Sequence, residues 1–306
     1  MNLPTLLSAS TILLCLACAC LGQVTAGDGP WVNEAEDVAA ANDAAPPPAE
    51  GTVLPFVPSY GFDLGDIGRA VQEKLSVQVS GTLQSKHIWH GFDLMDGHPV
   101  FFPVATLALG DTGFSAKVIG ACVIGGETSQ RDELDGALFY SRDLLPDTRW
   151  ATQGTLNYFY YGKPRISSRR ADAQELGLSL SWPKLLGGTP LVPSYYVGDL
   201  WPGEHGSLVS GISGFIHVLG LTYNWALPNP GPEDHAQIFK LYGDLTYNDG
   251  FGGAGHGWSH VTLGTSTNLM AGKVIVTPAL NYQVSMNDAI TPETGFWGGV
   301  TFTYYF

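Results

Sequence analysis

The stretch that decides the fold is the end of the chain, Gly295-Phe296-Trp297-Gly298-Gly299-Val300-Thr301-Phe302-Thr303-Tyr304-Tyr305-Phe306. Counted back from Phe306, every second residue is aromatic, apolar or glycine, and three of the residues between them carry hydroxyl groups. This period of two predicts a β-strand with one apolar face. Its length is about that of a tilted strand crossing the hydrocarbon core of a membrane. We expect such a final strand where the first and last strands pair to close a barrel.

The same stretch resembles the C-terminal assembly signal of bacterial outer-membrane β-barrel proteins, which end in Phe with aromatic or apolar residues at alternate positions before it. The residues that carry the resemblance are Phe302, Tyr304 and Phe306. The resemblance implies a barrel in outer-membrane lipid, and a last strand that is recognised by the barrel-assembly machinery.

The composition is typical of a chain with many strands and turns. Only 14% of the 306 residues are charged, and the chain contains 39 Gly, 13 Tyr and 8 Trp. The formal net charge is −14. Binding to nucleic acid needs clustered Lys and Arg, so this charge argues against a nucleic-acid partner.

The first segment has the features of a secretory leader. An apolar run over residues 12–21 precedes Val24-Thr25-Ala26, which satisfies the small-residue rule for cleavage, so residues 1–26 are interpreted as a signal peptide. Lipidation at Cys20, which lies inside this segment, is the alternative processing route. Removal of the leader would leave Cys122 without a cysteine partner in the chain.

Residues 27–75 are rich in acidic residues, Ala and Pro, and little in them could form a core. We interpret them as a disordered periplasmic arm. Near its end Ile67, Val71 and Leu75 are four residues apart, which is typical of one face of a short helix; a solvated lead-in turn is the alternative.

Strand-length segments of alternating hydrophobicity recur from residue 76 to residue 306, which we assign to the barrel. An even number of strands puts both termini on one side, expected to be the periplasm, and most short connections fall on that side. The fold class is therefore all-β, a closed antiparallel transmembrane barrel. The twelve predicted strands span residues 76–89, 99–109, 114–124, 133–141, 150–161, 175–182, 191–200, 211–225, 236–248, 261–269, 274–286 and 295–306.

A second resemblance lies at the end of the first predicted strand, Ser85-Lys86-His87-Ile88-Trp89-His90-Gly91-Phe92. It is similar to the signature of outer-membrane porins of the TorF type, in which an aromatic and apolar stretch leads into Arg-Gly. The resemblance implies a small porin-like barrel. Because His90 stands in the place of that Arg, it implies no particular selectivity.

Charged side chains within the strands should point into the lumen, because charges on the lipid face cost a few kcal/mol each at mid-membrane. Mixed signs argue against a dedicated anion channel, which should show a basic ladder. Twelve strands enclose a space between the filled interior of eight and the open channel of sixteen. Both a narrow aqueous path and a lumen closed by paired side chains fit this size. The candidate lumen charges are Lys86, Lys117, Glu133, Asp135, Glu175, Lys240 and Asp244.

Catalysis and metal binding receive little support. The loop over residues 199–207 contains Asp199, His205 and Ser207, but no activated-serine motif. His256 and His260 follow His235, yet four residues along a strand separate side chains by about 13 Å. We therefore expect no catalytic residues, no metal and no cofactor.

The sequence thus predicts an outer-membrane porin-like channel for passive diffusion of small hydrophilic solutes. The first alternative is a closed structural or adhesive barrel that acts through its outer loops. The second, less favoured, is an outer-membrane hydrolase.

Overall fold

A computed structural model describes residues 75–125, 132–164, 171–187, 189–203, 211–227, 237–271 and 273–306. The predicted signal peptide and acidic arm lie outside these residues, apart from Leu75. Among the described residues, no helix is long and apolar enough to cross a membrane.

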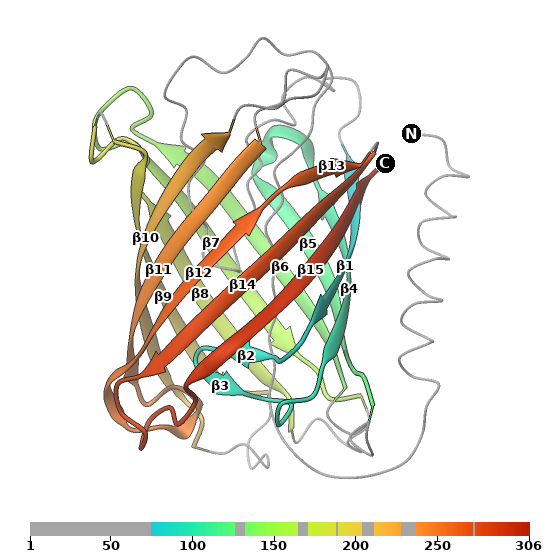
Figure 1. Ribbon diagram of the computed structural model, residues 1–306, viewed down its shortest axis with the longest axis vertical. Coiled ribbons are helices and arrows are strands. Elements are labelled where there is room, and N and C mark those ends of the chain that lie inside the picture. Colours follow the sequence, from blue (N-terminus) through green and yellow to red (C-terminus); the bar gives the residue numbers. More distant parts are fainter. Residues whose placement is uncertain are drawn as a thin grey trace.

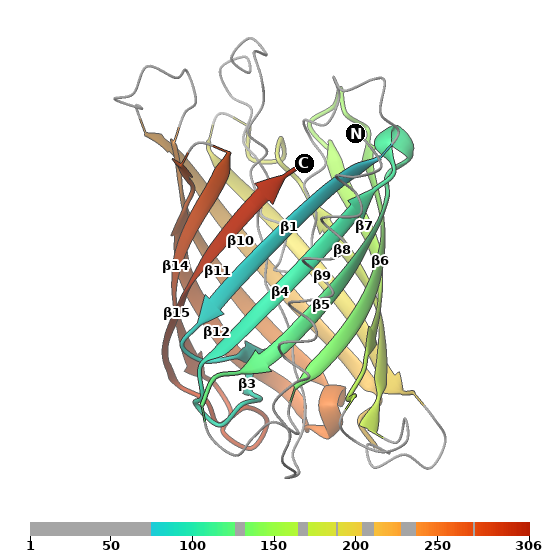
Figure 2. The same ribbon diagram turned by 90° about the vertical axis from the view of Figure 1, so that its right-hand side faces the viewer.

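Twelve long strands form one antiparallel barrel, as Figures 1 and 2 show from two sides. A short strand, β13 (Leu269–Ala271), continues β12, and a two-stranded hairpin, β2 (Ile88–Trp89) and β3 (Phe92–Asp93), lies apart from the barrel sheet. The long strands are β1 (Ser76–Gln84), β4 (Val100–Ala108), β5 (Phe114–Val123), β6 (Glu133–Leu144), β7 (Thr152–Tyr161), β8 (Ala173–Ser181), β9 (Leu191–Pro202), β10 (Gly214–Leu227), β11 (Gln237–Asp249), β12 (His256–Thr267), β14 (Val274–Ser285) and β15 (Gly295–Tyr305).

The last strand closes the barrel, as its sequence predicts. β15 pairs with β14 on one side and with β1 on the other, in a register that runs from Gln78 opposite Tyr305 to Gln84 opposite Gly299. β12 pairs with β14, so no strand of the described sheet is left as an open edge. Closure matters because an open edge in lipid would leave backbone N–H and C=O groups unpaired.

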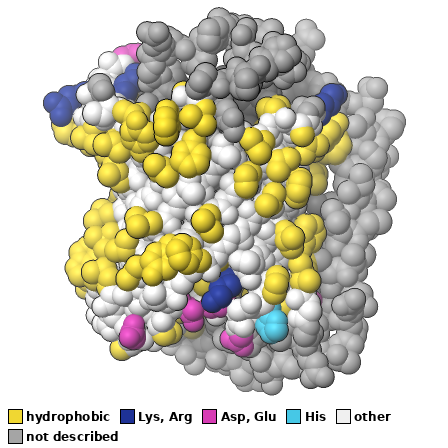
Figure 3. All heavy atoms as spheres, viewed as in Figure 1, with side chains coloured by type: hydrophobic (Ala, Val, Ile, Leu, Met, Phe, Trp, Pro, Cys, Tyr) yellow, Lys and Arg dark blue, Asp and Glu magenta, His cyan; other side chains and the backbone are white. Residues whose placement is uncertain are grey.

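Side chains alternate between an apolar exterior and a more polar interior. On β10, Leu219 is 49% exposed on the outside, whereas Thr222 is fully buried on the inside. Figure 3 shows hydrophobic side chains spread over the barrel wall, with Lys, Asp, Glu and His at its rims. This pattern is the reverse of a water-soluble barrel, and it matches a wall that faces hydrocarbon.

Two glycines make room for tyrosines that lie against the inner wall. A Cβ on Gly264 would overlap the ring of Tyr242, which crosses β12 and donates to Asn281 on β14. Likewise, a Cβ on Gly177 would overlap Tyr196 of β9. Glycine at these positions lets a large side chain bridge neighbouring strands without entering the lumen.

All twelve predicted strands are present, but the predicted extension of the first strand to Trp89 is wrong. β1 ends at Gln84, and the chain then turns away from the wall. His90 and Gly91 have φ angles of 46° and 96°, in the left-handed region, which reverses the chain between β2 and β3. The connection between the first two barrel strands is therefore residues 85–99, which is longer than the predicted strand bounds leave.

A charge placed on the outer wall tests this orientation. Leu263 on β12 is 54% exposed on the outside, and its neighbour Thr262 faces inward opposite Asp244. Leu263→Arg should destabilise the folded barrel by about 2–4 kcal/mol in lipid vesicles, because guanidinium would enter hydrocarbon. Thr262→Arg should cost much less, since it would meet a carboxylate. Urea titration of both refolded variants measures the difference, and an equal cost would contradict the assigned faces.

Candidate functional site

The two ends of the barrel differ. We call the end where β1 begins and β15 finishes the terminal end, and the opposite end the distal end (Figure 1). Residues 85–99, here called the plug segment, fold into the distal end. His87, Trp89 and Met95 are 2%, 3% and 0% exposed, although they belong to a connection between strands. The backbone N–H of Leu94 donates to the carbonyl of His87 at 3.1 Å, which holds the segment as a compact turn.

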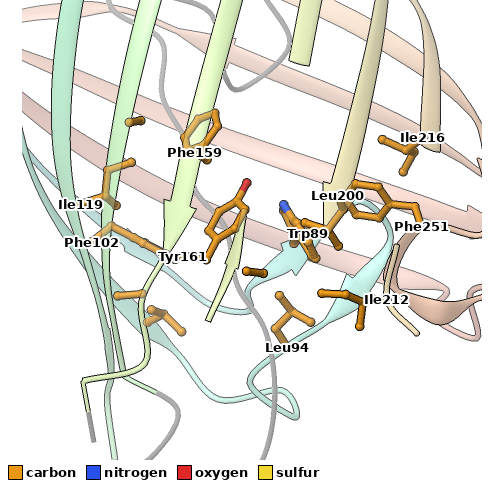
Figure 4. Close-up of a cluster of buried hydrophobic side chains, with 14 of the residues drawn as sticks. Trp89, Leu94, Phe102, Ile119, Phe159, Tyr161, Leu200, Ile212, Ile216 and Phe251 are labelled. Carbon is orange, nitrogen blue, oxygen red and sulfur yellow. The ribbon is translucent and has the colours of Figure 1, made fainter. Parts of the chain in front are cut away.

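The plug segment packs into an apolar cluster that fills the distal end. The ring centroid of Trp89 lies 5.7 Å from that of Tyr161 and 5.1 Å from that of Phe251. Figure 4 shows these side chains pointing toward one another from the plug segment, β7 and the η4 turn, Phe251–Gly253. Burying each large apolar side chain favours the packed state by about 1.5–3 kcal/mol. Further members of this distal cluster are Leu94, Phe102, Ile119, Phe159, Leu200, Ile212 and Ile216.

Polar groups join the plug segment to the wall inside this cluster. Glu175 on β8 is fully buried and accepts hydrogen bonds from Tyr161, at 2.7 Å, and from Tyr196. Nε2 of His90 lies 3.9 Å from the Glu175 carboxylate. On the other side of the barrel, Nε2 of Gln283 donates to the carbonyl of Gly91 at 2.9 Å. The plug segment is thus held from β8 and from β14, on different parts of the wall.

A second group of charges lies beside the β7–β8 connection at the distal end. Lys163 and Glu133 form a buried ion pair. Carboxylate oxygens of Asp135 and Asp172 accept the backbone N–H groups of Gly162 and Lys163, both at 3.1 Å. These carboxylates therefore fix a connection between strands, which is a structural role. Lys163 was not among the candidate charges, because it lies just beyond its strand.

The seven predicted lumen charges separate along the barrel axis. Glu133, Asp135 and Glu175 are buried in the distal end. Lys86 lies outside β1, in the plug segment, with 35% of its side chain exposed and its Nζ 3.7 Å from Asp93. The other three are on β5 and β11, outside the distal cluster, which Lys117 borders through the ring of Phe139.

Lys117 and Lys240 lie on opposite walls of the barrel. β5 and β11 are six strands apart in the ring of twelve, and each lysine is the fourth residue of its strand from the terminal end. Nζ of Lys117 lies 5.2 Å from the ring centroid of Phe139. Asp244 is four residues further along β11, on the same face as Lys240, and is the strand partner of Thr262. Between the distal cluster and the terminal rim, the described wall therefore carries few charges.

Most of the inner wall outside the distal cluster carries hydroxyl and amide groups instead. Adjacent strands place them directly opposite one another, and two of these pairs hydrogen bond: Ser141 with Thr155, and Thr82 with Thr301, each at 2.9 Å. We call these sets the hydroxyl rows. They are Ser141, Thr155 and Ser179 on β6–β8; Gln153, Ser181 and Ser194 on β7–β9; Thr222 and Tyr242 on β10–β11; and Thr277, Thr301 and Thr82 on β14, β15 and β1.

The histidines considered for a metal site are separated by the wall. His260 is buried inside and hydrogen bonds to Ser259, whereas His256 is exposed at the distal rim beside Asp249. Within the described part of the chain, no group of three His, Cys, Asp or Glu could hold a metal ion. His235 and the segment with His205 and Ser207 lie outside the described residues.

The residues of the assembly-signal resemblance lie on the outer face of β15. Phe302 is 52% exposed and Phe306 is 38% exposed, and the rings of Tyr304 and Phe306 contact each other with centroids 4.9 Å apart. They are accessible on the strand that closes the barrel.

Comparisons with known proteins give a likeness of fold alone. No protein-family model and no curated protein matches the chain, and the resemblance to TorF-type porins is not confirmed. Three solved structures align over most of it: the NanC porin (9% identity, 74% of this chain and 98% of that chain, TM-score 0.42), the KdgM porin (10%, 76% and 99%, TM-score 0.42) and an outer membrane channel from Pseudomonas putida F1 (11%, 80% and 100%, TM-score 0.41).

Acid should loosen the plug segment through His87. Burial lowers the pKa of His87 well below its ordinary 6.5, and the charge of Lys163 lowers it further. The released segment therefore binds a proton that the packed segment excludes. The packed state loses up to about 1.4 kcal/mol for each pH unit below about 6.5.

Hydrogen exchange at the Leu94 amide, corrected for intrinsic rates, measures this release between pH 7.5 and pH 5.5. His87→Phe should flatten the pH dependence, because Phe keeps the packing against Phe102, whose ring centroid lies 4.9 Å away, and does not titrate. The same slope in both proteins would assign the effect to another group.

Proposed function

We propose that the protein is a channel of the bacterial outer membrane through which small hydrophilic solutes diffuse, and that the plug segment controls its distal end. The observation that carries this proposal is the contrast between the two parts of the interior. The distal end is filled with apolar side chains, as in a protein core. The rest of the inner wall is lined by hydroxyl and amide groups, which favour a watery interior over a packed one.

The apolar exterior supports the membrane location. In water, so extensive a band of exposed Leu, Phe and Trp would drive association. Closed barrels are one of two architectures that satisfy their backbone groups in lipid, and the predicted leader directs the chain to the cell envelope. Both ends of the barrel chain lie at one end of the barrel, which we assign to the periplasm. The exposed aromatic residues of β15 fit recognition by the barrel-assembly machinery.

The plug segment can leave without damage to the wall. β2 and β3 pair with each other and with no barrel strand. Release of the part between its two ends would cost the packing of Trp89 and its neighbours and a few hydrogen bonds, while the backbone bonds of Ser85 to Gly298 and of Ile124 to Pro99 could stay in place at the wall. The plug segment can therefore be released while the barrel wall stays intact, as a gated channel requires.

A closed structural barrel is the competing function, because the distal cluster seals one end. It predicts no conductance from inserted protein under any condition. The structure offers no positive support for the hydrolase alternative.

Conductance of the refolded protein in a planar bilayer decides between the channel and the closed barrel. We expect discrete steps that are rare at neutral pH. Gln283→Ala removes hydrogen bonds to the carbonyls of Gly91 and Glu293, each 2.9 Å long, and should raise the ratio of open to closed channels by about 5- to 30-fold. Gln153→Ala changes an inward glutamine away from the plug segment and should leave the ratio unchanged. Silence from verified, inserted protein would overturn the channel.

The two charges on β11 should set the weak ion preference of an open channel. Lys240→Gln should move the reversal potential toward cation preference, and Asp244→Asn toward anion preference, because each removes one fixed lumen charge. Lys184→Gln is the control, since its Nζ donates to the carbonyl of Pro146 in an exposed turn, at 2.6 Å. Unchanged potentials in both lumen variants would place these residues outside the conducting path.

A further inference from the structure

The inner wall carries buried polar groups without hydrogen-bond partners, and three of these residues, Ser179, Ser194 and Thr222, belong to the hydroxyl rows. Five hydroxyl oxygens and both side-chain polar atoms of one asparagine are shielded from solvent and make no hydrogen bond. Each of these residues is at least nine-tenths buried, and each lies at an inward position of its strand. They are Ser115, Asn157, Ser179, Ser194, Thr222 and Thr303.

An unpaired buried hydroxyl or amide costs about 1–3 kcal/mol. Protein interiors normally pair such groups, so a set of them on one lining surface calls for a ligand or water that supplies partners. A hydroxyl group can donate one hydrogen bond and accept up to two. The best-matched solute is one that itself carries several hydroxyl groups along its length.

The charges nearby select against ionic solutes. Within the described wall, the inward charges between the distal cluster and the terminal rim are Lys117 on β5 and the pair Lys240 and Asp244 on β11, so one side of the barrel carries a single positive charge and the opposite side one charge of each sign. A desolvated anion or cation would therefore meet a row of neutral dipoles and no compensating cluster.

The polar groups continue up to the edge of the distal cluster. Asn157 is the direct strand partner of Phe139, whose ring packs edge to face with that of Phe159, with centroids 5.5 Å apart. Both rings are 2% exposed and belong to the distal cluster, so hydroxyl and amide groups are the contacts that the inner wall offers a solute.

We propose that the hydroxyl rows form a binding surface for uncharged polyhydroxylated solutes of saccharide type, which the barrel passes in preference to ions and ethers of equal size. This inference rests on the proposed channel function, and names the solute class that the channel takes. The rows on β6–β9, with Thr222 on β10, form its most extensive part.

Proteoliposome uptake tests the solute class. Glucose should enter faster than gluconate, glucosamine or a polyethylene glycol of similar size. The triple variant Ser179→Ala, Ser194→Ala, Thr222→Val removes three row hydroxyls at nearly constant volume. It should lower glucose uptake on the order of tenfold, since each lost hydrogen bond is worth about 0.5–1.5 kcal/mol and losses are incompletely additive. Ion conductance of the variant should stay within about twofold.

Thr189→Ala is the matched control. Its hydroxyl donates to the carbonyl of Leu186 at 2.8 Å in an exposed turn, so its removal should leave uptake unchanged. Uptake that follows size alone, or a triple variant that takes up glucose like the parent, would overturn the inference and leave the channel intact.

Calorimetry of glucose binding in detergent separates the two proposals if no solute crosses. If the parent protein then binds glucose and the triple variant does not, the binding surface is supported and the channel function is rejected. Absence of binding as well as passage would reject both.

Discussion

The structure depends on one constraint, which is that every strand of the described barrel finds a partner on both sides. β15 meets β1 across more than two hundred residues of sequence, and this pairing turns a sheet with two open edges into a closed wall. With the backbone groups satisfied by the ring, the two faces of each strand are free to serve different solvents. The exterior carries Leu, Phe and Trp for lipid, and the interior carries Ser, Thr and Asn. Backbone hydrogen bonds thus hold the wall together. The alternation of inward and outward side chains sets the polarity of its two faces.

The interior of the barrel has two parts, an apolar packed part and a polar part. At the distal end, aromatic and aliphatic side chains around Trp89 exclude water, and the buried carboxylate of Glu175 is satisfied by two phenols. Elsewhere, hydroxyl groups face one another between neighbouring strands. A barrel that served only as a scaffold would gain stability by extending the apolar packing throughout. The restriction of that packing to the end reached by the plug segment is the basis of the proposed channel function.

Strand positions were predictable from sequence because alternation reports directly on the two faces of a wall, and the closing role of the last strand followed from its pattern. The plug segment was not predictable. His87, Ile88 and Trp89 continue the composition of a strand, and whether such residues stay in the wall or turn inward depends on the reversal at His90 and Gly91. Charges near strand ends, such as Glu133 with Lys163, pair through a connection whose path the sequence does not specify. The hydroxyl rows depend on register between strands, whereas alternation gives only the face.

The tether from Gln283 to the Gly91 carbonyl joins positions separated by 192 residues. The plug segment connects β1 and β4, the first two barrel strands. The residue that anchors it, Gln283, is on β14, the penultimate strand. During assembly the segment can collapse against β7 and β8 early, but it gains its hold from β14 only when the last strands arrive. The last contact that holds the plug segment is therefore made by the same strands that complete the ring.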